Sequence, residues 1–145
     1  MIRVTVARAE GKHTVSREFA RRCARAAIRS VRRRKALLSV VLIGSRFSRR
    51  LNREFLGHDC VTDVIAFPLG SPETPEGEVY VNVERARSQA REYGVTVREE
   101  TARLIVHGTL HLTGYDDRRA SDALRMRKAE DRVLDSLFVK RKRKK

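Results

Sequence analysis

The sequence predicts a single small α+β domain in which a four-stranded mixed sheet packs against about five helices, with a metal site at the end of one helix. Three observations support this fold class. The length of 145 residues is that of one domain. The spacing of apolar residues alternates between the strand period and the helix period. The resulting order, β-α-β-α-β-β-α-α-α, contains no repeat or linker. We assign the domain to residues 1–139.

The first half of the chain alternates strands with helices. IRVTVA (2–7) alternates β-branched with polar residues, as a half-buried strand does. From Ser16 apolar residues recur every three to four positions and arginines face away, which predicts an amphipathic helix with an arginine-rich outer face. The apolar run 36–44 is predicted to be a central strand, and 45–57 a helix that Gly57 ends.

The second half contains two further strands and three helices. The strands are expected at 62–69 and 77–82, joined by a turn-rich loop, and the helices at 83–94, 96–113 and 121–138. Thr96 begins a T-V-R-E sequence that can form a capping box. The six consecutive cations at 140–145 are expected to form a disordered tail.

Charge is the dominant feature of the composition. Thirty-three Lys and Arg against 18 Asp and Glu give a net charge of +15, which indicates a polyanionic partner such as nucleic acid. A solubility surface, or a high-salt or thermophile bias, is the alternative. Cys23 and Cys60 fit neither a metal pair nor a disulfide framework. No segment resembles a signal peptide or approaches the ~20 apolar residues of a membrane span, so we expect a cytoplasmic protein.

The segment HGTLHLTGYDD (107–117) has the spacing of a metal site. His107 and His111 lie four residues apart, on one face of a helix, although two polar residues on a partly buried face would show the same spacing. Gly114 can end the helix and reverse the chain, so that Asp117 returns as a third ligand. Asp116 is the competing carboxylate. Three ligands with an open position are typical of a catalytic zinc site.

Two other enzyme classes use related ligand patterns. One clan of zinc peptidases has H-E-x-x-H-x-x-G-x-x-H, but Gly108 stands where that motif has its glutamate base. Two histidines and a carboxylate also describe the non-haem iron oxygenases. Nothing in the sequence indicates the β-rich barrel of those oxygenases, and we favour neither class.

The 107–117 segment resembles the H-G-x-L-H-L-x-G-Y-D-H motif of the YbeY endoribonucleases, which are 16S rRNA maturation factors of bacteria. LNREFLGHDCVTDVIAFPL (51–69) and GEVYVNVERARSQAREYG (77–94) resemble two further segments of that family, and the likeness extends over about residues 36–139. It implies a zinc-dependent, single-strand-specific endoribonuclease that acts in 16S rRNA 3′-end maturation and ribosome quality control. The three histidine ligands of the family carry over to His107, His111 and the position of Asp117.

The sequence departs from the family pattern at three positions. Asp117 replaces the third histidine, which keeps zinc plausible as one ion per chain and shifts the ligand set toward harder ions such as Mn²⁺. Leu56 replaces an arginine associated with activity, and Arg53, one helical turn earlier, could compensate. Glu78 replaces an aspartate and retains the charge.

The remaining assignments are weaker hypotheses. Glu78 and Asp63 are the candidates for a general base. Candidate RNA contacts are Arg53, Arg32, Arg33, Arg34 and Lys35. The expected partners are rRNA and ribosomal particles, with no membrane and no DNA, and the protein is expected to be a monomer. The alternative function is a metal-containing, non-catalytic rRNA-binding factor in ribosome assembly.

Overall fold

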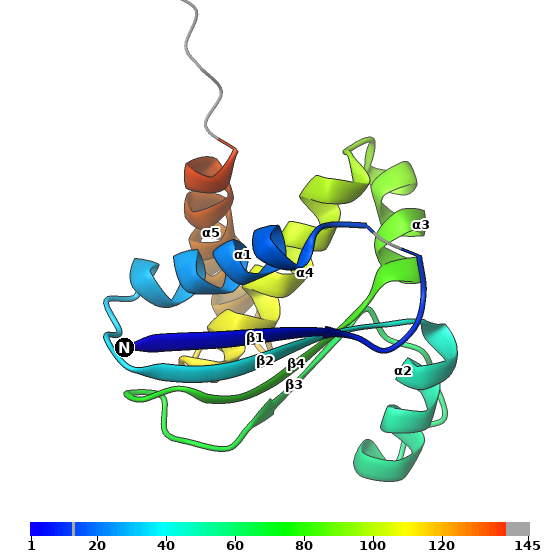
Figure 1. The fold of residues 1–145 in the computed structure, drawn as a ribbon, viewed down its shortest axis with the longest axis horizontal. Helices are drawn as coiled ribbons and strands as arrows, with labels where there is room; N and C mark the ends of the chain where they lie inside the picture. The colour runs from blue at the N-terminus through cyan, green and yellow to red at the C-terminus, as the bar shows by residue number, and fades with distance from the viewer. Residues whose placement is uncertain (13, 139–145) are drawn as a thin grey trace, which may run out of the picture.

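The computed structural model describes residues 1–12 and 14–138, and the tail predicted at 140–145 lies outside them. One mixed sheet forms the centre of the molecule (Figure 1). Its strands are β1 (Ile2–Arg8), β2 (Ala36–Ile43), β3 (Val64–Pro68) and β4 (Glu76–Asn82), in the order β1-β2-β4-β3. β2 is parallel to both of its neighbours, whereas β3 runs antiparallel to β4 along one edge. The predicted four-stranded mixed sheet is confirmed.

Most of the helices cover one face of this sheet, as Figure 1 shows. They are α1 (Arg17–Ser30), α3 (Val83–Tyr93), α4 (Val97–Leu112) and α5 (Ala120–Leu137). The main core lies between this layer and the inward side chains of the strands. α2 (Ser45–Leu51) packs on the opposite face over a small second cluster, which is built around Ile43, Leu51 and Ile65. The predicted α+β fold with about five helices is confirmed.

The helix predicted at 45–57 differs in its second half. After Leu51 the chain forms a π-helical segment, η1 (Asn52–Leu56), and Gly57 ends it in the left-handed conformation, with φ of 70°. Asn52 is buried there, and its side-chain amide donates to the carbonyl oxygens of Ser48 and Cys60. This pairing holds η1 against the loop that precedes β3, and single-turn π segments occur often at functional sites.

Helix α4 is the element that fixes the site. Thr96 and Glu99 form the predicted capping box, since each side chain bonds the backbone N–H of the other residue. Buried residues occur on nearly every side of α4, so it lies in the core between the sheet and the neighbouring helices. A Cβ atom at Gly108 would collide with Val79 on β4 and come within 3.0 Å of Val64 on β3. The absence of a side chain therefore lets α4 lie directly on these two strands.

Helix α1 is amphipathic as predicted. The Ser16 hydroxyl accepts from the Phe19 amide and caps the helix, and a row of alanines beside Cys23 and Ile28 is buried in the core. The arginines of this helix are turned outward or to its flanks. Among the described residues, no helix combines the length and apolar character that crossing a membrane requires.

Candidate metal centre

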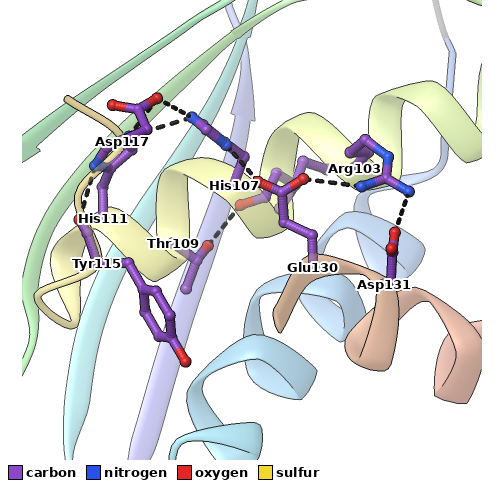
Figure 2. Close-up of polar contacts among 9 residues, drawn as sticks. Arg103, His107, Thr109, His111, Tyr115, Asp117, Glu130 and Asp131 are labelled. Carbon is purple, nitrogen blue, oxygen red and sulfur yellow. Dashed lines mark hydrogen bonds and ion pairs between the residues drawn. The ribbon is translucent and has the colours of Figure 1, made fainter. Parts of the chain in front are cut away.

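The last two turns of α4 carry His107 and His111 on one face (Figure 2). The helix ends at Leu112. Gly114 then takes a φ of 107°, a conformation that residues other than glycine rarely adopt. The chain reverses there, and the loop before α5 brings Asp117 back toward the two imidazoles. The turn predicted from the glycine is therefore the feature that gathers the three groups.

Three side-chain atoms converge at this point. The two Nε2 atoms of His107 and His111 are 3.2 Å apart, and Asp117 Oδ2 lies 3.6 Å from the first and 3.8 Å from the second. A tetrahedral zinc ion with bonds of about 2.0–2.1 Å separates its ligand atoms by roughly 3.4 Å. The group therefore has the dimensions that a single ion requires, and these three residues could hold one.

The opposite nitrogen of each imidazole has a partner of its own. His107 Nδ1 lies 2.5 Å from Glu130 Oε2, and His111 Nδ1 lies 3.0 Å from the Tyr115 carbonyl oxygen. Because both partners are acceptors, each ring carries its proton on Nδ1 when neutral, and the lone pair of Nε2 faces Asp117. Metal-binding histidines are commonly oriented in this way. This arrangement is the strongest structural sign that the group is built for a cation.

The Glu130 carboxylate is itself held in place. Its side chain is only 5% exposed, and its other oxygen accepts from Arg103 at 2.8 Å. A second nitrogen of Arg103 lies 2.7 Å from Asp131 (Figure 2). α5 thus supplies the anion that orients a histidine of α4, and a buried carboxylate is stable there because it is paired.

The two histidines titrate in opposite directions. Burial lowers the pKa of His107, but the hydrogen bond and negative charge of Glu130 outweigh it, so that this pKa is raised above its usual value. Burial and the nearby charge of His107 lower the pKa of His111. In the metal-free protein a single proton on this pair is therefore held more strongly by His107 than by His111.

The structure gives Asp116 and Asp117 different surroundings. Asp116 Oδ1 accepts from the Arg118 amide at 2.9 Å, which makes it a turn residue. Asp117 belongs to the three-residue group. Tyr115 packs against the core through its ring and contributes its carbonyl oxygen to His111.

A cleft of about 440 Å³ opens beside the metal-binding group. Its walls come from η1, from β3 and the residues just before it, from the end of α4 and from the loop that follows α4. They include Asn52, Leu56, Asp63, His107, His111 and Asp117. Two observations follow from this lining. Asp63, one of the two predicted base candidates, faces the group, and Leu56 occupies the wall at the position where the family pattern has an arginine.

The other predicted site residues lie away from this cleft. Val79 of β4 packs under α4, so Glu78, next to it in the strand, points to the opposite face, where it accepts from the Tyr80 hydroxyl. The structure therefore does not bring Glu78 to the metal group. Arg53 lies 3.5 Å from Asp59 with its side chain largely exposed, and it does not line the cleft.

The basic segment 32–35 lies in the connection between α1 and β2. Arg33 donates to the Pro72 carbonyl oxygen, and Pro72 lies close to Gly114. Arg32, Arg34 and Lys35 are exposed. This segment thus borders the region behind the Gly114 turn and forms no part of the cleft wall.

Fold and site together define a small α+β protein in which two histidines and one carboxylate beside a cleft could hold a metal ion. The family model described as Endoribonuclease YbeY matches residues 5–138. The chain belongs to the YbeY endoribonuclease family. The predicted family and enzyme class are both confirmed by this match.

Individual relatives agree with the family match. An Endoribonuclease YbeY from Chlorobium luteolum is 44% identical over 101 residues, which cover 70% of this chain and 74% of the relative. Another from Carboxydothermus hydrogenoformans is 37% identical over 110 residues, covering 74% and 77%. A solution structure of a Thermotoga maritima protein superimposes with a TM-score of 0.69 at 26% identity, covering 96% of this chain and 90% of that one.

Proposed function

We propose that the protein is a zinc-dependent endoribonuclease that cuts single-stranded rRNA, in 16S rRNA 3′-end maturation and ribosome quality control. Family membership supports the ribonuclease activity. The observation that carries the metal dependence is the convergence of His107, His111 and Asp117, with both Nδ1 atoms already bonded to acceptors. Mn²⁺ is the alternative ion, because a carboxylate replaces the third imidazole.

The cleft beside the metal-binding group is the proposed place for the scissile phosphodiester. When bound, the metal would supply Lewis acidity toward a phosphoryl oxygen and toward a water molecule. Asp63 lines the same cleft, and we assign to it the role of accepting the proton of the attacking water or ribose 2′-OH. Arg103, locked to Glu130 and Asp131, keeps the imidazole of His107 oriented throughout.

Charge would bring the RNA to the surface of the protein. The net charge of +15 favours a polyanion in any orientation, and the exposed cations of segment 32–35 lie behind the Gly114 turn. We propose that residues 1–139 act as one monomeric domain on rRNA in ribosomal particles in the cytoplasm. Residues 140–145 add six cations for phosphate contact. No membrane or DNA partner is part of this proposal.

One observation supports the alternative of a metal-containing assembly factor without catalytic activity. Leu56, an apolar residue, lines the cleft where the family pattern has an arginine, and Arg53 is paired with Asp59 outside it. No cation takes the place of the missing arginine among the described residues that line this cleft. A Leu56→Arg variant tests this alternative directly, because it should raise cleavage at least tenfold if the missing charge limits turnover.

The experiment that tests the proposed function compares cleavage with metal content. Purified protein is loaded with Zn²⁺ or Mn²⁺ and incubated with single-stranded and double-stranded RNA, and the ends formed are mapped. We expect cleavage of the single strand that EDTA abolishes and that His107→Ala removes. His58→Ala, at an exposed histidine outside the cleft, is the matched control and should retain activity. Stoichiometric zinc with no RNA cleavage would favour the assembly factor.

A further inference from the structure

A second, smaller cleft meets the first at the metal-binding group. It encloses about 250 Å³ between α3, α4 and α5. Asp63, His107 and Asp117 line both clefts, so the group lies at their junction. The metal chemistry proposed above accounts for His107, Asp117, Glu130 and Arg103 in this lining, but it gives no role to Gln89, Glu100 or Arg127.

Glu100 is the least explained of these groups. It lies on α4 two turns before His107, about 10 Å along the helix, and it is only 4% exposed. Its Oε2 accepts from the Gln89 side-chain amide at 2.7 Å. Burial raises the pKa of Glu100 above its usual value, although the Gln89 hydrogen bond opposes the rise. The charges of Arg103 and Arg127 also oppose the rise, but Gln89 is the one hydrogen-bond partner found for this carboxylate among the described residues. A ligand that brings further donors would therefore stabilise it.

The rest of the second cleft suits a flat, partly apolar ring. Leu104 and Met126 are buried and contribute apolar wall. Tyr93 lines the cleft with 60% of its surface exposed, so its ring is available for stacking. Arg127 is an exposed cation at the same opening. The volume is below the ~300–1,000 Å³ of sites for drug-sized ligands, as expected for one ring system.

We propose that the second cleft binds the base of a nucleotide adjacent to the scissile phosphate, and that guanine is the base it prefers. The inference rests on the proposed function, since it takes RNA as the substrate. Guanine presents two neighbouring donors, the N1 imino and N2 amino groups, to the acceptors offered by Glu100 and by the carbonyl end of Gln89. Tyr93 stacks on the base, and Arg127 contacts its phosphate.

Two other occupants are disfavoured by the lining. Inside the cleft a phosphate group would meet four carboxylates, and the cation there, Arg103, is already paired with Glu130 and Asp131. A phosphate therefore belongs at the rim beside Arg127. A second divalent cation would need several convergent ligand atoms. Within the part of the chain that the structure describes, the only such group is His107, His111 and Asp117, and Glu100 is not in it.

The first test measures binding of single nucleotides to the zinc-loaded protein. Guanosine, inosine, adenosine and uridine 5′-monophosphates share a phosphate, so affinity differences report on the base. We expect guanosine monophosphate to bind at least about tenfold more tightly than inosine monophosphate, which lacks the N2 amino group, as for one hydrogen bond to a charged acceptor. NMR signals of Leu104 and Met126 should shift on binding. Equal affinities, or shifts confined to other regions, would overturn the proposal.

Variants of residues in the second cleft test which side chains cause the preference for guanine. Glu100→Gln should bring the guanosine and inosine affinities within about twofold of each other, whereas Glu92→Gln removes the same charge from an exposed site on α3 outside the cleft and should leave the ratio unchanged. Tyr93→Ser, at an exposed position, should weaken all four nucleotides alike and serves as a second variant if Glu100→Gln fails to fold. A guanosine preference that survives Glu100→Gln would contradict the assignment.

Cleavage assays then separate this inference from the proposed function. Single-stranded oligonucleotides that differ only by guanosine, inosine or adenosine beside the cleaved bond are compared by kcat/KM, and we expect guanosine to be cut most efficiently. If nucleotides bind as expected and no oligonucleotide is cut, the base site stands and the nuclease proposal fails. If all oligonucleotides are cut equally and nucleotides bind equally, the nuclease proposal stands and the base site fails.

Discussion

The two halves of the metal-binding group are supported very differently. His107 and His111 stand on a buried helix, and each ring is fixed through its Nδ1 atom by an acceptor. Asp117 belongs to the loop between α4 and α5, its side chain is 46% exposed, and the contacts found for its carboxylate are those with the two histidines. The fold therefore builds two ligands in advance, and the loop supplies the third.

This difference has a thermodynamic consequence. Ligands held in position before binding lose little conformational entropy when an ion arrives, whereas a loop residue loses more. The two histidines should therefore determine whether the ion binds. Asp117 should determine how tightly the ion is held and the pKa of water bound to it.

The largest effect is expected at the histidines. His107→Ala or His111→Ala leaves two protein ligands, and we expect zinc affinity to fall roughly a thousandfold, taking about 4 kcal/mol per ligand. RNA cleavage should be lost in both variants. Thermal unfolding of the metal-free protein should change little in His111→Ala, whereas His107→Ala should also lower stability, because it removes a partner of the buried Glu130 carboxylate. Metal analysis and calorimetric titration measure these changes. Normal zinc content in either variant would exclude that histidine as a ligand.

A smaller but still large effect is expected at Asp117. Asp117→Ala should weaken zinc binding by about a hundredfold, since water can replace an exposed carboxylate more easily than a ring packed in the fold. Asp116→Ala removes the neighbouring charge and should cost less than tenfold, because that side chain bonds the turn. The two variants form a matched pair in the same zinc titration. If their order is reversed, Asp116 is the ligand.

Glu130→Gln tests how the orientation of His107 contributes to metal binding without removing a ligand. Loss of the buried anion should weaken zinc binding by about 10- to 100-fold. The pKa of His107 in the metal-free protein should fall, because the group that stabilises its protonated form is neutralised. NMR titration of the imidazole protons measures this shift. Asp131→Asn, which alters the exposed partner of Arg103, is the control and should leave the pKa of His107 within a few tenths of its original value.

The smallest effect concerns mobility in the absence of metal. Backbone amides of residues 113–119 should exchange with solvent faster in the metal-free protein than in the zinc-loaded one, whereas those of residues 104–111 should change little. Hydrogen exchange read by NMR resolves both segments in one experiment. If zinc slows amide exchange equally in both segments, the two histidines are not held in position before the metal binds.

The comparison also shows what the sequence could predict. The sequence predicts that His107, His111 and Asp117 converge across the turn at Gly114, because a helical spacing and a left-handed turn are local features. Glu130 was not found, since its contact with His107 depends on how α5 crosses α4. One signal was present in the sequence: Glu130 follows Ala129 and lies one turn after Met126, on the apolar face of its helix, where an unpaired charge would be costly.

The two candidate general bases, Glu78 and Asp63, also differ in how far the sequence alone predicts their positions. In β4 the apolar Val79 and Val81 alternate with Glu78, so the period alone already turns Glu78 away from the helix layer. Asp63 precedes β3, and its place in the cleft depends on how η1 and the following loop pack. That π-helical segment was not predicted, because its spacing resembles an ordinary helix and its geometry depends on the buried contacts of Asn52.

The most direct test of the central claim is X-ray absorption spectroscopy at the zinc edge of the loaded protein. A site made of His107, His111 and Asp117 predicts one zinc per chain with two imidazoles, light-atom ligands only and no sulfur. The imidazole count should rise to three in Asp117→His and fall to one in zinc-saturated His111→Ala. A sulfur ligand in the native protein, or a count that stays at two in both variants, would contradict the account.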